Sequence, residues 1–177
     1  DFVTSKYRTL YTYDNGSVAR KSEVEVNGEY RFVPIQSADI VVKGIQNVRD
    51  KFPWLIINNY IDSPHCKLFK REIIKNNNLL FPDLRRSQDI VFNMRHFEHI
   101  SSFCVMGQKA YVYRIVDGQM AKRIPPYYYK IYIEISAKRH QLLEKWKIQY
   151  DKVAFASYEF SYILAILLGV YRQKEAC

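Results

Sequence analysis

The stretch Ser63–Arg114 contains the most informative motifs of this chain. Residues 63–74 read SPHCKLFKREII, and they are followed by FPD at 81–83, SQD at 87–89 and YVYR at 111–114. The first segment is typical of a short strand that leads into a short helix, and Ser87 stands where a second helix, to about residue 99, would begin. The apolar positions around Gly107 predict short strands at 103–105 and 110–115.

The segments on either side of this stretch predict strands before it and helices after it. Residues 2–33 read as strands joined by tight turns at Asn15-Gly16 and Asn27-Gly28, and the alternation around the second turn predicts a hairpin with one apolar face. A helix is expected from Ser37 to Phe52, stopped by Pro53. The fold class is therefore α/β, with mixed strands and helices, β-hairpins at the N-terminus and helices at the C-terminus.

Beyond Pro125-Pro126 the pattern is wholly helical. One helix carries an apolar stripe that two polar residues interrupt midway, formed by Ile131, Ile135, Leu142 and Trp146. A final helix is expected over about 153–172. It is apolar, but Glu159 shortens its uninterrupted apolar run below the roughly twenty residues that span a bilayer, so we expect a buried or interface helix.

Length and composition are typical of one domain. The chain has 177 residues without repeats or linkers, so we expect a single domain, with mixed strands and helices over 1–118 and a helical extension over 119–177. Lys and Arg exceed Asp and Glu by 27 to 18, which favours anionic partners. Neither a run of like charges nor an aromatic–basic single-strand pattern occurs, so we expect no nucleic-acid partner. The three cysteines lack the spacing of a zinc site, and no metal ligands are expected here.

The order and spacing of the quoted segments resemble the C-terminal half of family 2 glycosyltransferases, which are inverting sugar transferases with the A-type glycosyltransferase fold. In that family a W/C-N/G-K-L-[FY]-K-R segment precedes an aromatic–proline pair, an acidic "ED" helix start and a closing Y-x-Y-R strand. The resemblance is strongest over Pro64–Arg114. It implies that this chain is the acceptor-side half of such an enzyme, with its catalytic base at Asp89.

Inverting sugar transfer needs a carboxylate that removes the proton of the acceptor hydroxyl. Near a helix N-terminus Asp89 should stay ionised, because the N–H groups and the helix dipole favour negative charge. The same stabilisation would lower its basicity. The alternative is that Asp89 only satisfies the first turn of the helix. Where the family has Glu before this Asp, the chain has Gln88, which keeps hydrogen-bonding capacity without the charge.

The substrate-binding residues expected beside Asp89 are Gln88, Lys67, His65, Cys66 and Arg86. By resemblance, His65 and Cys66 lie closest to the sugar site, in the segment that contains Lys67. Arg86, in the loop before Asp89, suits a diphosphate or an anionic acceptor. The alternatives are that His65 is a partly buried polar residue and that Arg86 is an ordinary loop arginine.

The donor side is expected to lie outside this sequence. Family members hold the nucleotide sugar in an N-terminal half whose Asp-x-Asp binds Mn²⁺ or Mg²⁺ on the diphosphate. No Asp-x-Asp occurs here, and the chain opens on Asp1 rather than Met. We therefore expect a preceding segment that carries the metal and the donor, and we expect this fragment alone to bind no metal and to be inactive.

The function that we expect is transfer of a sugar from a nucleotide-sugar donor to a saccharide or lipid-linked acceptor in bacterial surface polysaccharide synthesis. The enzyme would be cytoplasmic and peripheral to the inner membrane, which it would contact through the basic, aromatic C-terminal helices. The alternative is a non-catalytic, transferase-like interaction module whose C-terminal helices form a homodimer. Gln88 and the missing metal motif favour that alternative.

Overall fold

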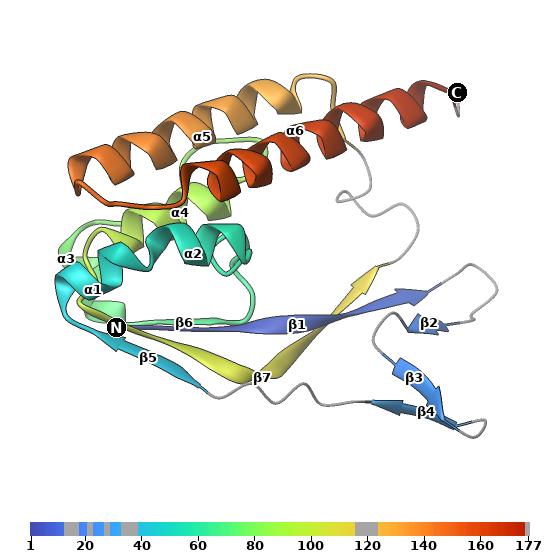
Figure 1. The fold of residues 1–177 in the computed structure, drawn as a ribbon, viewed down its shortest axis with the longest axis horizontal. Helices are drawn as coiled ribbons and strands as arrows, with labels where there is room; N and C mark the ends of the chain where they lie inside the picture. Colours follow the sequence, from blue (N-terminus) through green and yellow to red (C-terminus); the bar gives the residue numbers. More distant parts are fainter. Residues whose placement is uncertain (13–17, 21–22, 27–28, 33–38, 116–123, 176–177) are drawn as a thin grey trace.

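Two long strands form the centre of the sheet and run parallel to each other (Figure 1). They are β1 (Phe2–Thr12) and β7 (Ser102–Ile115). The computed structural model describes residues 1–12, 18–20, 23–26, 29–32, 39–115 and 124–175, with side chains at 1–4, 39–107 and 124–172. The structure is mixed α/β, and the fold class predicted from the sequence is confirmed at that level.

Three short strands complete this sheet. Strand β5 (Ile40–Lys43) pairs antiparallel with β7, whereas β6 (Lys67–Phe69) and β2 (Val18–Arg20) pair antiparallel with the two ends of β1. The β1–β7 ladder is irregular, because pairing passes from Ser5–Met106 directly to Tyr7–Tyr111. The two short strands expected around Gly107 are therefore two halves of one strand with an irregularity between them.

The strand register decides which side chains face the helices. Phe69, Phe2, Phe103 and Val42 are paired in one row across the sheet, and Phe2, Phe103 and Val42 are buried. The next row on the opposite face contains Leu68 and Val41, which are exposed. Because side chains alternate along a strand, one face of the sheet packs on helices and the other carries exposed apolar residues.

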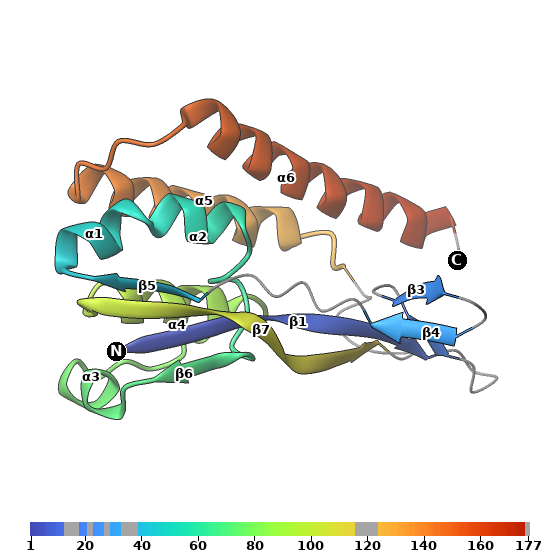
Figure 2. The ribbon, with the colours of Figure 1, turned by 60° about the horizontal axis from the view of Figure 1, so that its bottom comes forward.

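The helices lie on one face of the sheet in two layers (Figures 1 and 2). The nearer layer contains α1 (Ile45–Asp50), α2 (Phe52–Ile57) and α4 (Gln88–Phe97). The outer layer contains α5 (Tyr128–Lys145) and α6 (Lys152–Glu175), whereas the short α3 (Arg71–Asn76) follows β6 at the edge. This arrangement places the start of α4 between the sheet and the C-terminal helices.

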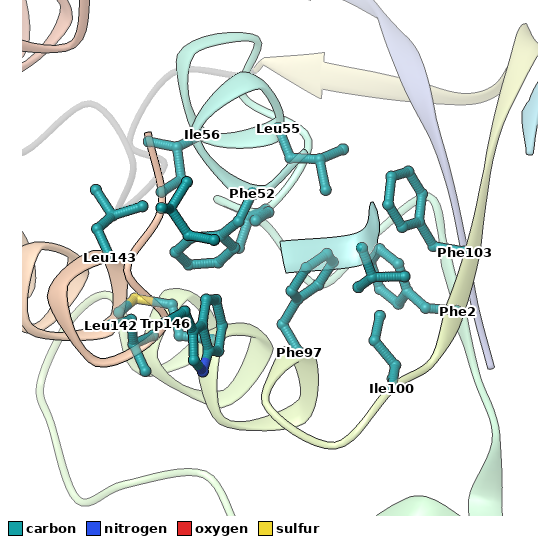
Figure 3. Close-up of a cluster of buried hydrophobic side chains, with 14 of the residues drawn as sticks. Phe2, Phe52, Leu55, Ile56, Phe97, Ile100, Phe103, Leu142, Leu143 and Trp146 are labelled. Carbon is teal, nitrogen blue, oxygen red and sulfur yellow. The ribbon is translucent and has the colours of Figure 1, made fainter. Parts of the chain in front are cut away.

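Aromatic rings join these layers in the core (Figure 3). Phe52 is fully buried, and its ring lies 5.3 Å from that of Phe97 and 5.2 Å from that of Trp146. Phe97 in turn contacts Phe2 and Phe103 on the sheet. Phe52 therefore links α2, α4 and the end of α5 in one apolar cluster.

The hairpin predicted at Asn27-Gly28 is present. Strands β3 (Glu23–Val26) and β4 (Glu29–Phe32) pair antiparallel on either side of that turn, which itself lies outside the described residues. The register pairs Val26 with Glu29 and Val24 with Arg31. Each valine therefore has a charged residue as its cross-strand partner, so the single apolar face expected from the alternation is wrong.

The helix predicted from Ser37 to Phe52 is wrong over its first half. Residues 40–43 form strand β5, because pairing with β7 outweighs the local helical spacing. Gly44 follows with φ of 93°, a conformation that favours glycine and ends any continuous helix. Pro53 lies in the first turn of α2 rather than stopping a helix, and Ser37 lies outside the described residues.

The other helix predictions are confirmed, except for the surroundings of the last helix. Helix α3 ends in the run of three asparagines at 76–78, and Asn78 has the left-handed φ that asparagine tolerates at the end of a helix. Helix α6 is present, but only 11% of its most apolar part is buried. Among the described residues it is the one helix with the length and composition to cross a membrane. Of the two alternatives expected for this helix, burial is therefore wrong for α6, and an interface helix stays a prediction.

Replacement of Phe52 by alanine should lower the free energy of unfolding by about 3–5 kcal/mol, because it removes a fully buried ring between three helices. Urea unfolding followed by circular dichroism measures the change. The matched control is Phe160→Ala, which removes an exposed ring and should change stability by less than about 0.5 kcal/mol. Equal losses in the two variants would contradict the assignment of Phe52 to the core.

Candidate functional site

The predicted site is built on the loop between α2 and β6, residues 58–66, which we call the α2–β6 loop. Asn59 and Cys66, near its two ends, have left-handed φ of 59° and 61°. Asn visits this region more readily than most residues, whereas Cys does so rarely. The backbone at Cys66 is therefore strained immediately before Lys67, and surrounding contacts must hold it there.

Helix α4 holds the α2–β6 loop through one amide. Asn93 is buried on α4, and its Nδ2 donates to the carbonyl oxygens of Ile61, at 2.5 Å, and Ser63, at 3.0 Å. A buried carbonyl without a partner would cost about 1–3 kcal/mol, so this amide satisfies the buried Ile61 carbonyl and also binds the partly buried Ser63 carbonyl. It also keeps the loop beside the helix that begins with Asp89.

The C-terminal helices hold the same loop through a buried ion pair. Nη2 of Arg139 on α5 lies 2.8 Å from Oδ1 of Asp62, and the Tyr158 hydroxyl on α6 donates to Oδ2 at 2.8 Å. The Arg139 guanidinium also lies against the Tyr132 and Tyr158 rings. Burial and the Asp62 charge raise the pKa of the Tyr158 hydroxyl, so it remains a donor to the carboxylate.

Arg139 and Asp62 were not among the residues expected at the site. The sequence contained one signal for Arg139, the polar interruption in the apolar stripe of α5. Arg139 occupies the buried position where the stripe would continue, between Ile135 and Leu142. A charged residue in a buried helical position normally has a partner, but the sequence did not indicate that this partner is Asp62.

Lys67 faces the helices because of the sheet register. It pairs with Thr4, which is fully buried and whose hydroxyl donates to the Tyr60 carbonyl at 3.4 Å. The Lys67 Nζ donates to the Ser63 hydroxyl and the His65 carbonyl at 3.5 and 3.4 Å. Burial lowers the pKa of Lys67 to about 8, although nearby Asp62 and Asp89 oppose the shift.

Asp89 lies half-buried in the first turn of α4. Its Oδ1 accepts the Ile90 N–H at 3.0 Å, while Ser87, which begins the helix, uses its hydroxyl with that of Tyr128 at 2.8 Å rather than as a cap. Burial raises the pKa of Asp89, the Asp62 charge raises it further, and the Ile90 N–H and Lys67 oppose the rise. The N–H groups at the helix start thus lower the pKa of Asp89, as expected, but burial outweighs them and the net shift is upward.

The other residues predicted for the site lie around Lys67 and Asp89 in different surroundings. His65 and Cys66 are half-buried in the α2–β6 loop, and burial together with the Lys67 charge lowers the pKa of His65. Gln88 is exposed at the start of α4. The Arg86 guanidinium lies 5.5 Å from the centre of the Tyr128 ring, so a cation–π contact holds it against α5.

The structure thus brings Lys67 and Asp89 within reach of each other's charge, with Asp62 as a third charged group. Together, Lys67, Asp89 and Asp62 can hold a proton on a carboxyl group that lies beside an ammonium group. It does not fit a divalent cation, because both Asp62 oxygens already have partners and the ammonium would repel the ion. Among the described residues no group of three or more His, Cys, Asp and Glu side chains is arranged to hold a metal.

A separate groove of about 310 Å³ lies between α4 and α5. Its rim is mostly basic and its floor apolar, with Arg95, Lys138, Lys145, Val91 and Met94 among the lining residues. None of the predicted site residues lines it. The groove is therefore not evidence for an acceptor site at Asp89.

Comparison with protein-family models and with curated proteins gives no match for this sequence.

Replacement of Arg139 by methionine should lower the free energy of unfolding by about 3–5 kcal/mol, because it leaves the Asp62 charge without its buried partner. The matched control is Lys145→Met, which breaks an ion pair of similar length to Glu98. The side chains of that surface pair are 64% and 27% exposed, against 1% and 13% for Arg139 and Asp62, so its loss should cost less than about 1 kcal/mol. Denaturant unfolding of both variants checks the difference.

The Lys67 ammonium should lose its proton near pH 8, about two units below an ordinary lysine. Carbon NMR of isotopically dimethylated lysines, recorded from pH 6 to 11, should show this signal, and Lys67→Arg should remove it. Exposed Lys130 supplies the control, since Lys130→Arg should leave that signal in place.

The lowered pKa of Lys67 also affects stability. Between about pH 8 and 10 this lysine is protonated in the unfolded chain but not in the folded one, so its contribution to the free energy of unfolding should rise with pH over that window.

Proposed function

We propose that this chain forms the acceptor side of an inverting glycosyltransferase that uses a nucleotide-sugar donor. One observation supports the proposal most directly. Asp89, at the position of the family's base, is a half-buried carboxyl group with a raised pKa that lies within the electrostatic reach of Lys67. A carboxylate of raised pKa is a better proton acceptor at neutral pH than an exposed aspartate.

The proposed reaction needs one proton transfer on this side of the sugar. The Asp89 carboxylate accepts the proton of the acceptor hydroxyl, and the oxygen forms its new bond to the anomeric carbon. The bond from that carbon to the diphosphate oxygen breaks on the opposite side, and its electron pair leaves with the diphosphate. Attack opposite the leaving group accounts for inversion, and the proton ends on Asp89.

Lys67 would control the charge state of Asp89 in this reaction. Its ammonium is mostly protonated at neutral pH and favours the ionised carboxylate, whereas burial and Asp62 favour the neutral acid. The reaction needs an ionised Asp89 before the transfer, which Lys67 favours, and a protonated Asp89 after it, which burial and Asp62 favour. His65 and Cys66, in the same α2–β6 loop, would contact the sugar, while exposed Gln88 and half-buried Arg86 would contact the acceptor.

The proposal assigns the metal and the donor diphosphate to residues outside this chain, because the described residues do not fit a divalent cation. Mn²⁺ or Mg²⁺ would neutralise the leaving diphosphate in the complete enzyme. A saccharide or lipid-linked acceptor in surface polysaccharide synthesis, on the cytoplasmic side of a bacterial inner membrane, belongs to the same proposal.

A second candidate is a non-catalytic interaction module with a transferase-like sequence. Two observations favour it: the described groove does not include Asp89, and α6 carries a large exposed apolar face. A homodimer through the C-terminal helices is the form that this module would take. The two candidates differ in whether the complete gene product binds a nucleotide diphosphate.

In the complete gene product, Asp89→Asn should reduce turnover at least about a hundredfold, since it removes the base. Binding of a nucleotide diphosphate in the presence of Mn²⁺, measured by isothermal titration calorimetry, should be unchanged. Asp83→Asn is the matched control, because Asp83 is exposed in the loop before α4 and should leave turnover intact.

Near-normal turnover of Asp89→Asn would reject Asp89 as the base. If the wild-type product shows no metal-dependent binding of the nucleotide diphosphate, the transferase proposal fails as a whole and the interaction module is favoured.

A further inference from the structure

Helix α6 is far more apolar than its surroundings explain. The segment Lys152–Arg172 has a mean hydropathy of 1.8 over its most apolar 18 residues, yet only 11% of that window is buried. Apolar helices in water-soluble proteins normally bury such residues in a core. Most of this surface therefore faces outward, on the outermost layer of the molecule (Figure 2).

The inward side of α6 contains the two polar residues that bind the rest of the domain, Tyr158 and Glu159. Glu159 is the one charged residue between Val153 and Tyr171, and its carboxylate accepts from the Ser136 hydroxyl at 2.5 Å and lies 2.9 Å from the His140 ring. Tyr158 donates to Asp62 on the same side. These contacts, together with buried Phe155, attach α6 along the domain.

The outward side of α6 is mainly apolar between Val153 and Tyr171. No charged side chain is exposed between Lys152 and Arg172, and the exposed residues that are not large and apolar are Ala and Ser. The large exposed side chains are between 43% and 76% accessible, and they are Val153, Phe160, Leu164, Leu167, Leu168 and Tyr171. We call these six residues the α6 outer face. A contiguous apolar surface of this kind marks an interaction site.

The pattern of the α6 outer face fits a lipid surface better than a second helix. A coiled-coil seam is narrow and has charged residues beside it, which select the partner. Here Leu167 and Leu168 are both exposed, and the flanking positions Ala156, Ser161 and Ala165 are uncharged, so the face is wide and has no charged border along its sides. Such a face suits a partner that is itself broad and apolar.

Charge is found at the two ends of the helix instead. Lys152 and Arg172 are exposed on either side of the apolar surface, and the chain as a whole carries a formal charge of +9. Cationic residues near a membrane are attracted to anionic head groups. The contacts of Tyr158 and Glu159 with the domain hold α6 flat against it. Helix α6 could cross a membrane only if these contacts were broken.

We propose that the α6 outer face binds the surface of a bilayer that contains anionic lipid, with α6 parallel to the membrane plane. Phe160, Leu164 and Leu167 enter the boundary between head groups and acyl chains, and Lys152 and Arg172 contact the anionic head groups. Binding of this type depends on buried apolar area together with electrostatic attraction. The proposal is independent of the transferase activity, because none of the six residues belongs to the candidate site.

Co-sedimentation of the full chain with vesicles tests the proposal. Wild-type protein should sediment with vesicles of phosphatidylcholine and phosphatidylglycerol, and more weakly with phosphatidylcholine alone. The double variant Phe160→Ser/Leu167→Ser should lose affinity for the anionic vesicles by about tenfold or more, because it removes two inserted side chains. The matched control, Val41→Ser/Leu80→Ser, removes two exposed apolar side chains elsewhere and should bind normally.

A second measurement leaves the apolar face intact. The tryptophan emission of Phe160→Trp should shift to shorter wavelength on addition of anionic vesicles, whereas that of Leu80→Trp should not. Absence of wild-type binding to any vesicle, or equal binding of the wild type and the α6 double variant, would overturn the proposal. So would a concentration-dependent dimer, seen by analytical ultracentrifugation, that the α6 double variant abolishes, because a second copy would then cover the face.

Discussion

The buried ion pair between Asp62 and Arg139 is the interaction on which the arrangement of the candidate site depends. It joins the α2–β6 loop to α5, and Tyr158 extends the connection to α6. In a low-dielectric environment two opposite charges at 2.8 Å attract strongly, but each is costly to bury without the other. The pair therefore contributes more to the position of the loop than to overall stability.

The same pair influences the electrostatics of the site. Asp62 places a negative charge near both Lys67 and Asp89, and it acts on the two groups in the same direction. It raises the pKa of Lys67 against the effect of burial, and it adds to the effect of burial on Asp89. Removal of the Asp62 charge in the α2–β6 loop would thus lower the pKa of both Lys67 on β6 and Asp89 on α4.

The C-terminal helices have two different surfaces for a related reason. Three of their polar side chains, Arg139, Tyr158 and Glu159, point inward and find partners in the loop and on α5. The outward surface of α6 is left with apolar and small residues. Between Val153 and Tyr171 the one charged residue of α6 is directed to its own domain, so the outward surface there presents a partner mainly with apolar area.

The sequence by itself determined the local elements between Lys67 and Phe97. Short-range signals are sufficient for α3 and α4. For α3 the signal is the run of asparagines at 76–78, where the helix ends. For α4 it is the polar start at Ser87 and Gln88, followed by apolar residues at helical spacing. Only the tertiary structure decided that residues 40–43 form a strand, that Arg139 is buried against Asp62, and that burial raises the proton affinity of Asp89. These outcomes depend on contacts between residues far apart in the chain, where strand pairing and desolvation outweigh local preference.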